Sequence, residues 1–307
     1  MRILGLLAVA VALAGCGNWS NQDLLFLNAL PVKEDLRSKL PQATGQSPLT
    51  GQPQTRRDGL TGDRSALYDA TQKATNDFNR ILDNLLDVVE AIRKHPPTTR
   101  SPGQRVWGPY PDPKHAGFRV RMTIEKLTDA DFAYRLELNK DQTPEWFAVL
   151  QGTFKASGGI RVGQGHVEFL PQVARDHQVA LPDLGGLQAI GIDYVNDHFP
   201  TDEAMTLSVA PATDGGSSDI AYTYHEAEDT SGAMQFKSKS TDGSFDVNSQ
   251  WLKSGAGRAN VVGTSSDGGM GTWQECWDAT FGVVYSAKSW AMAAAVGSAA
   301  ACEIPAP

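Results

Sequence analysis

The chain has 307 residues, of which 41% are hydrophobic, and a formal net charge of −8. This length provides one large domain, or two small ones, with an ample core. The acidic balance argues against nucleic acid as a partner and against electrostatic adhesion to anionic lipid, because both require a basic surface.

Residues 1–15 have the pattern of a secretory signal peptide. Arg2 precedes an apolar run from residue 3 to residue 14. A run of about a dozen apolar residues is too short for a membrane span, which needs roughly 20, and is typical of a secretory signal. We therefore expect an exported protein from which this segment is removed.

The signal ends in Leu13-Ala14-Gly15-Cys16, which resembles the lipobox of bacterial lipoprotein precursors. The resemblance implies cleavage before Cys16, a diacylglycerol on its sulfur and an acyl chain such as palmitate on its new amino group. Several acyl chains hold a protein far better than one, at about 0.8 kcal/mol per buried methylene. Gly17 in place of Asp implies the outer membrane. The alternative is an ordinary signal peptide with Cys16 as a spare thiol.

The chain contains three cysteines. If Cys16 carries lipid, Cys276 and Cys302 remain as a pair in an oxidising compartment, and one disulfide is the most economical interpretation. Such a bond would close a loop of about 27 residues and stabilise the fold by on the order of 3 kcal/mol. A catalytic thiol would need a neighbouring base and would be poorly kept reduced there.

Residues 16–64 are expected to form a lipid-anchored tether. Residues 23–30 and 33–40 contain enough leucines for two short amphipathic turns that dock on the domain. Residues 41–64 are poor in apolar side chains and rich in Gln, Thr, Gly and Pro, so they bury too little surface to order themselves. About 24 flexible residues reach roughly 25 to 30 Å, which would lift the domain clear of the lipid headgroups.

Residues 65–97 show the strongest helical pattern in the chain. The apolar stripe consists of Leu67, Ala70, Ala74, Phe78, Ile81, Leu85, Val88 and Ile92, and it is widened by Leu82, Leu86 and Val89. Pro96 and Pro97 end the helix. The stripe requires an apolar partner, either a second copy in a coiled coil or, as we prefer, the sheet that follows.

Residues 98–289 are expected to form an antiparallel β-domain, because the hydrophobic period changes to 2 and glycine-rich turns recur about every ten residues. Strands are expected at residues 105–110, 118–125, 132–139, 146–156, 160–170, 187–195, 204–210, 220–227, 233–240, 244–253, 258–263, 271–278 and 280–286. Residues 171–186 form a surface excursion with at most one helical turn. Residues 290–307 are an Ala-rich tail with a short helix before Cys302.

The fold class is therefore mainly β (α+β). We expect a large antiparallel meander, barrel-like or two-layered, with the long amphipathic helix packed on its apolar face. A transmembrane β-barrel also fits the alternation, but it would leave the helical stripe without a partner.

The residues disclose no catalytic constellation, and we expect no cofactor and no metal site. His166 and Glu168 share a strand face, but two ligands are a weak signal because polar residues alternate along any solvated strand. Trp273, Glu275 and Trp277 also share a face. They form either an aromatic ligand platform or, as we prefer, the strand that closes the core.

Three functions remain open. We favour a non-enzymatic outer-membrane lipoprotein with a structural or binding role, whose partners are the membrane through Cys16 and an apolar ligand or envelope protein, and not nucleic acid. A carrier of lipid or another apolar ligand in a half-barrel is similar in architecture to outer-membrane lipoproteins that receive and insert other lipoproteins. It predicts a dry cavity of roughly 300 Å³ or more beneath the helix. An envelope hydrolase would require carboxylates with shifted pKa values in one cleft.

Overall fold

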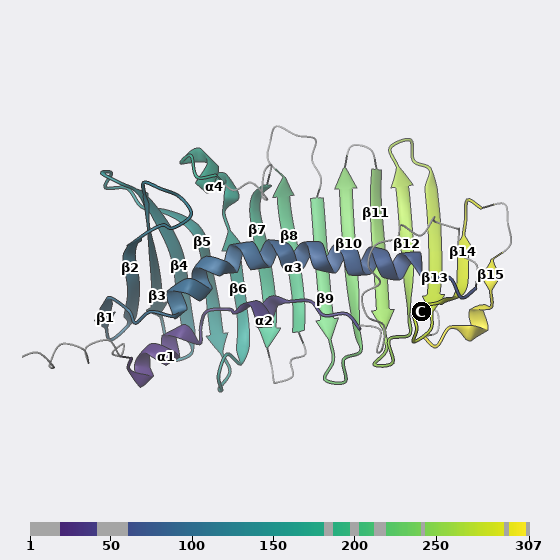
Figure 1. The fold of residues 1–307 in the computed structure, drawn as a ribbon, viewed down its shortest axis with the longest axis horizontal. Coiled ribbons are helices and arrows are strands. Elements are labelled where there is room, and N and C mark those ends of the chain that lie inside the picture. The colour runs from purple at the N-terminus through teal and green to yellow at the C-terminus, as the bar shows by residue number, and fades with distance from the viewer. Residues whose placement is uncertain are drawn as a thin grey trace, which may run out of the picture.

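The computed structural model describes residues 19–41, 61–180, 187–196, 203–211, 219–240, 243–291 and 295–304. These residues form one open antiparallel sheet of 15 strands, which are hydrogen-bonded in the order in which they occur in the chain (Figure 1). One long helix lies across one face of the sheet. The expected fold class is confirmed, and the described strands form an open sheet that does not close into a barrel.

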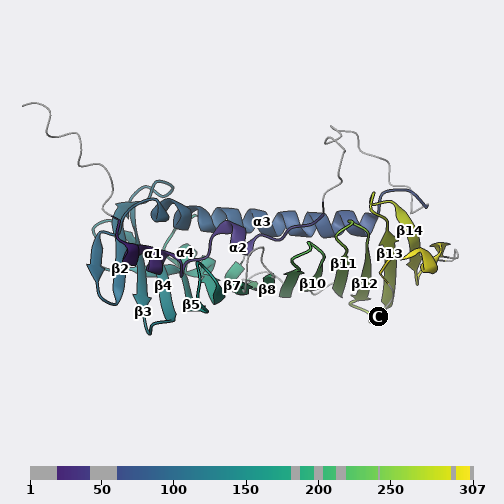
Figure 2. The same ribbon diagram turned by 90° about the horizontal axis from the view of Figure 1, so that it is seen from below.

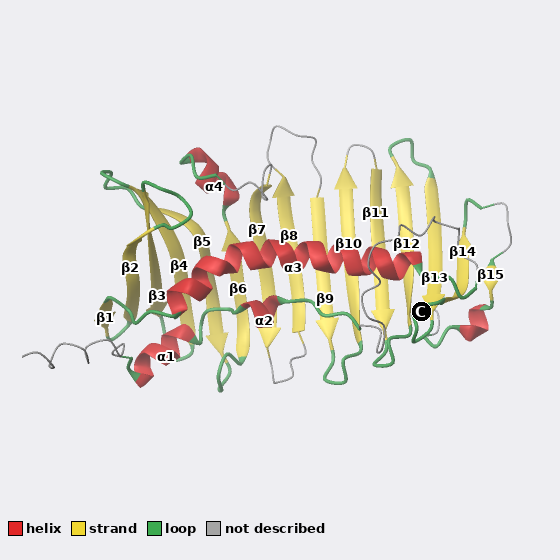
Figure 3. Ribbon diagram, viewed as in Figure 1, coloured by secondary structure: helices red, strands yellow, loops and turns green. Residues whose placement is uncertain are grey.

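The strands follow one another along the sheet, and α4, Pro171–Asp176, lies between β6 and β7 (Figure 3). Their bounds are β1 Thr99–Ser101, β2 Gln104–Pro111, β3 Phe118–Lys126, β4 Asp131–Lys140, β5 Phe147–Ala156, β6 Gly163–Phe169, β7 Leu187–Asn196, β8 Glu203–Pro211, β9 Asp219–Glu226, β10 Gly232–Ser240, β11 Gly243–Trp251, β12 Gly257–Ser265, β13 Met270–Trp277, β14 Val283–Lys288 and β15 Val296–Gly297. The two edge strands were not expected, because two or three residues are too short to show an alternation.

The tail differs from the expectation of a short helix over the alanine run. β15 pairs with β14 there, and among the described residues of the tail the helix is limited to one 3₁₀ turn, Ala299–Ala301, directly before Cys302. Gly297 adopts a φ of +75°, a conformation that interrupts a helix. The described part of the tail is therefore an extension of the sheet.

Helix α3, Ala66–Arg93, crosses the strands and lies above the sheet as a second layer (Figure 2). Its 28 residues make it about 42 Å long at 1.5 Å per residue. Ser65 caps its start by accepting a hydrogen bond from the amide of Tyr68 at 3.1 Å. Near its end, the carbonyl of His95 accepts a hydrogen bond of 2.8 Å from the indole of Trp107 on β2.

The buried face of α3 is rotated slightly from the expected stripe. Leu82 and Leu86 are fully buried at its centre, whereas Ala70, which was assigned to the stripe, is exposed. Thr71 and Thr75 are also buried in the first half of the helix, beside Leu67, Tyr68 and Phe78. Their hydroxyls donate to the carbonyls four residues earlier, at 2.7 and 3.0 Å, so burial leaves them hydrogen-bonded.

Four glycines allow large aromatic rings to lie flat on the sheet beneath the helix. Each glycine is the direct cross-strand partner of one ring, in the pairs Gly152 with Tyr134, Gly165 with Tyr194, Gly232 with Trp251 and Gly257 with Trp277. A Cβ atom on any of these glycines would overlap the facing ring. This pairing covers bare backbone with aromatic surface, and the rings are at most 3% exposed.

The described part of the expected tether, residues 19–41, lies against the domain. It contains α1, Asn21–Leu27, and α2, Lys33–Leu36. The expected docking is borne out for part of its apolar residues, because Phe26, Leu30 and Leu36 are at most 2% exposed, whereas Leu24 and Leu25 are 50% and 41% exposed. Residues 1–18, with the expected signal peptide and Cys16, and residues 42–60, with most of the expected flexible segment, lie outside the described residues.

Polar contacts also attach this N-terminal segment to the domain. Arg93 on α3 donates to the carbonyls of Leu27 and Leu30 at 3.0 and 3.1 Å. The hydroxyl of Tyr222 on β9 donates to Ser38 at 2.8 Å, and burial raises the pKa of Tyr222 to about 12. Residues 19–41 are therefore a packed part of the domain.

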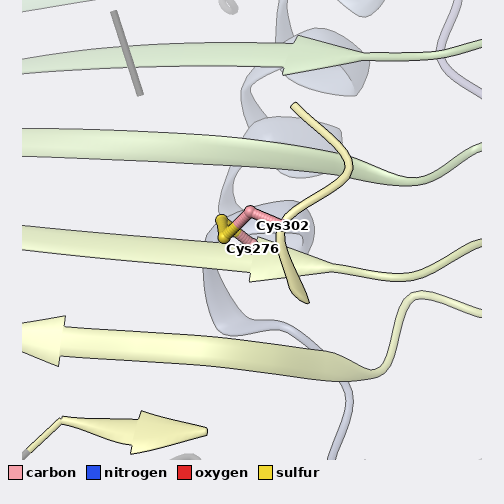
Figure 4. The surroundings of a disulfide bond; sticks show 2 residues. All are labelled: Cys276 and Cys302. Atoms are coloured by element: carbon pink, nitrogen blue, oxygen red, sulfur yellow. A yellow bond between two sulfur atoms is a disulfide. The ribbon is translucent and has the colours of Figure 1, made fainter. Parts of the chain in front are cut away.

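The C-terminal tail is joined to β13 by a disulfide between Cys276 and Cys302, whose Cα atoms are 5.6 Å apart (Figure 4). Cys276 lies on the face of β13 opposite to the one that packs on α3, as its position between Glu275 and Trp277 requires. The bond thus holds the tail on the far side of the sheet from the helix.

Candidate functional site

The helix-facing side of the sheet is the place where a half-barrel carrier would hold its ligand. Most of this space is occupied by α3. Phe78 stacks on Tyr222 with ring centroids 4.7 Å apart, and Leu82 and Leu86 pack into the same core as residues of the sheet. The helix therefore fills the middle of this face.

One apolar pocket of about 240 Å³ remains beside the second half of α3. Its floor is Leu136, Leu138, Val149, Leu150 and Phe169, which come from β4, β5 and β6. Leu85 and Val88 form the helix wall, and Ala174, Val179 and Ala180 form the opposite wall, in and after α4, Pro171–Asp176. The strands supply a rigid apolar base because their inward positions alternate with solvated ones.

The mouth of the pocket is polar. Asp112, Lys114 and His115 come from the connection between β2 and β3. His115 is in contact with Asp112 Oδ2 through Nδ1 at 2.8 Å and with the carbonyl oxygen of Ala180 through Nε2 at 3.1 Å. Lys114 reaches Asp87 on α3 at 3.4 Å. These contacts join the two loops and the helix around the opening.

The chemistry of the pocket is that of a binding site for a small apolar group. Its volume is below the roughly 300 Å³ expected for a carrier, which is also the lower end for drug-sized ligands. Leu85 and Val88 belong to the expected helical stripe, but the pocket itself was not predicted from the sequence. Its lining comes from six separate segments, namely α3, the connection between β2 and β3, β4, β5, β6 and the α4 region, whose meeting depends on the tertiary fold.

His166 and Glu168 lie on the solvated face of β6, as expected. They have separate partners: His166 Nδ1 contacts Asp193 at 2.8 Å, and Glu168 accepts from Gln151 at 2.7 Å. Among the described residues, no group of three His, Cys, Asp or Glu side chains is placed to hold a metal ion. The structure thus adds no third ligand to this pair.

Trp273, Glu275 and Trp277 lie on the helix-facing side of β13. Trp277 is 2% exposed, packs on Tyr68 and donates to the carbonyl of Gly255 at 3.0 Å. Glu275 is 1% exposed, and its Oε2 accepts hydrogen bonds from Ser65 Oγ at 2.6 Å and from the amide of Leu67 at 2.9 Å. The interpretation of this stretch as part of the core, linked to the tail, is therefore borne out for Glu275 and Trp277, but β13 does not close the sheet, because β14 and β15 follow it.

The carboxyl groups with shifted pKa values belong to separate structural contacts. Burial alone would raise the pKa of Asp23, but hydrogen bonds from Arg100, Ser20 and Arg105 outweigh it and hold that pKa far below its usual range. Burial raises the pKa of Asp35, which lies 3.1 Å from Arg161. Hydrogen bonds lower the pKa values of Asp87, Asp129, Asp229 and Asp267, and in Asp278 they outweigh burial, which alone would raise the pKa. Within the described residues, none of these seven carboxyl groups lines the apolar pocket, so the arrangement expected for a hydrolase is not found there.

The comparisons with known proteins add no further assignment. No family model, curated protein or solved structure matches this chain. Within the described part of the chain, no helix has both the length and the apolar character needed to cross a membrane.

Proposed function

We propose that this protein is a lipoprotein of the outer membrane with a non-enzymatic binding role. The anchor rests on the sequence Leu13-Ala14-Gly15-Cys16 at the end of a short apolar signal. The arrangement of the N-terminus supports it, because the chain becomes part of the folded domain only a few residues after Cys16, at α1. A lipid on Cys16 would thus attach the domain directly to the bilayer.

The anchor is tested by changing Cys16→Ser in the full-length protein. We expect this variant to leave the membrane fraction and appear in the soluble envelope fraction, because the several acyl chains are lost. Cys302→Ser is the matched control: it also removes one cysteine but should remain with the membrane. A Cys16→Ser protein that stays membrane-bound would contradict the proposal.

The binding role rests on the pocket between α3 and strands β4 to β6. Its floor and the wall formed in and after α4 are apolar, and its polar lining residues are Asn84 on α3 and Asp112, Lys114 and His115 in the connection between β2 and β3. This distribution is typical of sites that hold an apolar group inside and fix a polar group at the entrance. A medium-length acyl chain with a carboxylate head has this chemistry, and Lys114 and His115 are placed near the head. A carrier of whole lipids is less well supported, because α3 occupies the space it would need.

Octanoate is a suitable probe for this pocket. We expect isothermal titration calorimetry to detect its binding to the wild-type protein and to Val262→Trp, which changes an exposed valine outside the pocket. Val149→Trp should abolish binding by filling the floor. Equal binding by the two variants, or no binding by the wild type, would contradict this assignment.

A further inference from the structure

The position of the N-terminal segment bears on how the domain sits on its membrane. Trp19 is the first described residue and lies three residues after Cys16. Three residues span at most about 11 Å when fully extended. If Cys16 carries the lipid, Trp19 therefore lies within about 11 Å of the anchored residue, and residues 42–60, which follow the docked segment, add nothing to this distance.

Exposed apolar side chains gather at the end of the sheet that carries α1. They are Trp19, Leu24, Leu25, Leu127 and Ile160, with exposed fractions of 38, 50, 41, 61 and 68%. We call them the apolar rim. Leu24 and Leu25 belong to α1, Leu127 to the turn between β3 and β4, and Ile160 to the turn between β5 and β6.

Hydrogen bonds and ion pairs connect the elements that carry this rim. The amide of Lys126 donates to Gly103 at 2.8 Å, and Lys126 lines one hollow together with Ser20 and Leu25 of the α1 region. The two turns are neighbours, because the amide of Ala156 donates to Ala130 at 2.9 Å. Arg161, next to Ile160, pairs with Asp35 of α2. In Figure 1 these turns and α1 lie along the lower end of the sheet.

We propose that the apolar rim inserts into the headgroup region of the bilayer to which Cys16 is anchored. This inference rests on the proposed lipid anchor and goes beyond it, since an anchor alone leaves the orientation of the domain open. Trp and Leu side chains on a short amphipathic helix are typical of interfacial contacts, in which apolar groups enter the boundary by about 5 to 10 Å. The contact is apolar because charged side chains beside the rim already have partners of opposite charge: Lys126 pairs with Asp129, and Arg100 pairs with Asp23.

The occupant of the rim is therefore a lipid surface, and the domain lies against it with α1 and these turns facing the headgroups. This orientation is the reverse of a domain raised by a flexible tether. The strand ends at the other side of the sheet, including the start of β13 with Met270, would face away from the membrane. Met270 is 73% exposed and offers a matched apolar control outside the rim.

The test uses the full-length lipidated protein in vesicles of phosphatidylethanolamine and phosphatidylglycerol, with and without brominated acyl chains. Leu24→Cys, Leu127→Cys and Met270→Cys each receive an environment-sensitive fluorophore. We expect brominated lipid to quench the label at residues 24 and 127 at least about twofold more strongly than at residue 270, because bromine quenches only labels near the bilayer. Two labelled sites in separate elements guard against a local effect of one substitution.

Two results would overturn the inference, and they are distinguishable. Equally weak quenching at all three positions, in protein that floats with the vesicles, would show that the domain stands away from the bilayer while the anchor is intact. Wild-type protein that does not float with the vesicles would overturn the anchor itself, and the orientation with it.

Discussion

At the scale of single residues, the fold depends on contacts between positions far apart in the chain. Asp23 is fully buried, and it accepts hydrogen bonds from Arg105 at 2.7 Å and Arg100 at 3.1 Å. It also accepts one from the amide of Ser20, which begins α1. One carboxylate thus holds the start of the chain on strands β1 and β2.

We expect Asp23→Asn to lower the free energy of unfolding by about 3 to 5 kcal/mol at neutral pH, because Arg105 would remain buried without its charged partner. The lowered pKa of Asp23 means that its contribution is present above its ordinary pKa of 3.8 and is lost as the pH falls below it. Urea denaturation of both proteins between pH 7 and about pH 2 should therefore show a difference that shrinks on acidification.

Asp141→Asn is the control for this pair. Asp141 also pairs with an arginine, Arg119, but its side chain is 53% exposed. Its removal should cost less than about 1 kcal/mol. A similar loss in both variants, or a difference that does not depend on pH, would contradict the role assigned to Asp23.

The glycines beneath the aromatic rings permit a second prediction. Gly165→Ala would place a methyl group against the ring of Tyr194, so we expect it to destabilise the protein by about 1 to 3 kcal/mol. Gly263→Ala, also within a strand, meets only one atom, at 3.9 Å, and should be neutral or slightly stabilising. The melting temperatures of the two variants, from thermal unfolding, measure both changes in stability. Equal melting temperatures would show that the ring moves aside without cost.

At the scale of elements, the helix and the sheet are joined at the start of α3 by a carboxylate. Glu275 accepts from the amide of Leu67, which is one of the first amides of the helix and has no partner within it. A negative charge at this end also interacts favourably with the helix dipole. The contact fixes the point on the sheet from which α3 begins.

We expect Glu275→Ala to reduce stability by about 1 to 3 kcal/mol, since it leaves a buried amide without an acceptor. Hydrogen exchange at the amide of Leu67 should become faster than exchange in the middle of α3. Glu168→Ala, on the solvated side of the sheet, should change stability by less than about 0.5 kcal/mol. Unchanged protection at Leu67 in Glu275→Ala would exclude this carboxylate as the cap.

The elements were predicted more completely than their contacts. Alternation and helical periodicity depend on neighbouring residues, so they located α3 and nearly all strands. The expected stripe on α3 was wide, and periodicity alone did not show that Thr71 and Thr75, rather than Ala70, are buried in the first half of the helix. The leucines of residues 23–40 were also recognised from the sequence as residues of short amphipathic turns that would dock on the domain. Asp23 pairs with Arg100 and Arg105, about 80 residues further along the chain, and no local sequence pattern indicates such a pair.

At the scale of the whole molecule, an open sheet has edge strands that pair on one side only, and other contacts must hold them in place. The last strand, β15, has two residues and two register partners in β14, Tyr285 and Ser286. The disulfide between Cys276 and Cys302 holds this end to β13. The pocket illustrates the limit of sequence reasoning at this scale, because its walls meet only after the strands, α3 and α4 have been assembled.

We expect Cys276→Ser with Cys302→Ser to lose on the order of 3 kcal/mol of stability in denaturant. The tail should also become accessible to limited proteolysis between residues 295 and 304 before the rest of the domain unfolds, because β15 alone is a weak attachment. Oxidised wild-type protein provides the comparison, and reduction of it should reproduce the behaviour of the variant. A tail that stays protected in the reduced protein would show that pairing with β14 is sufficient.

Because α3 crosses the strands, the length of the helix is coupled to the width of the sheet that it covers. Adding one hairpin would widen the sheet by about 9.6 Å, and a helix needs six to seven more residues to cover that width. Seven residues are close to two full turns, so the same side of the helix would still face the strands. The length of α3 is thus matched to the number of strands that it crosses. In enlarged versions of this protein, α3 should lengthen by one heptad for every hairpin added to the sheet.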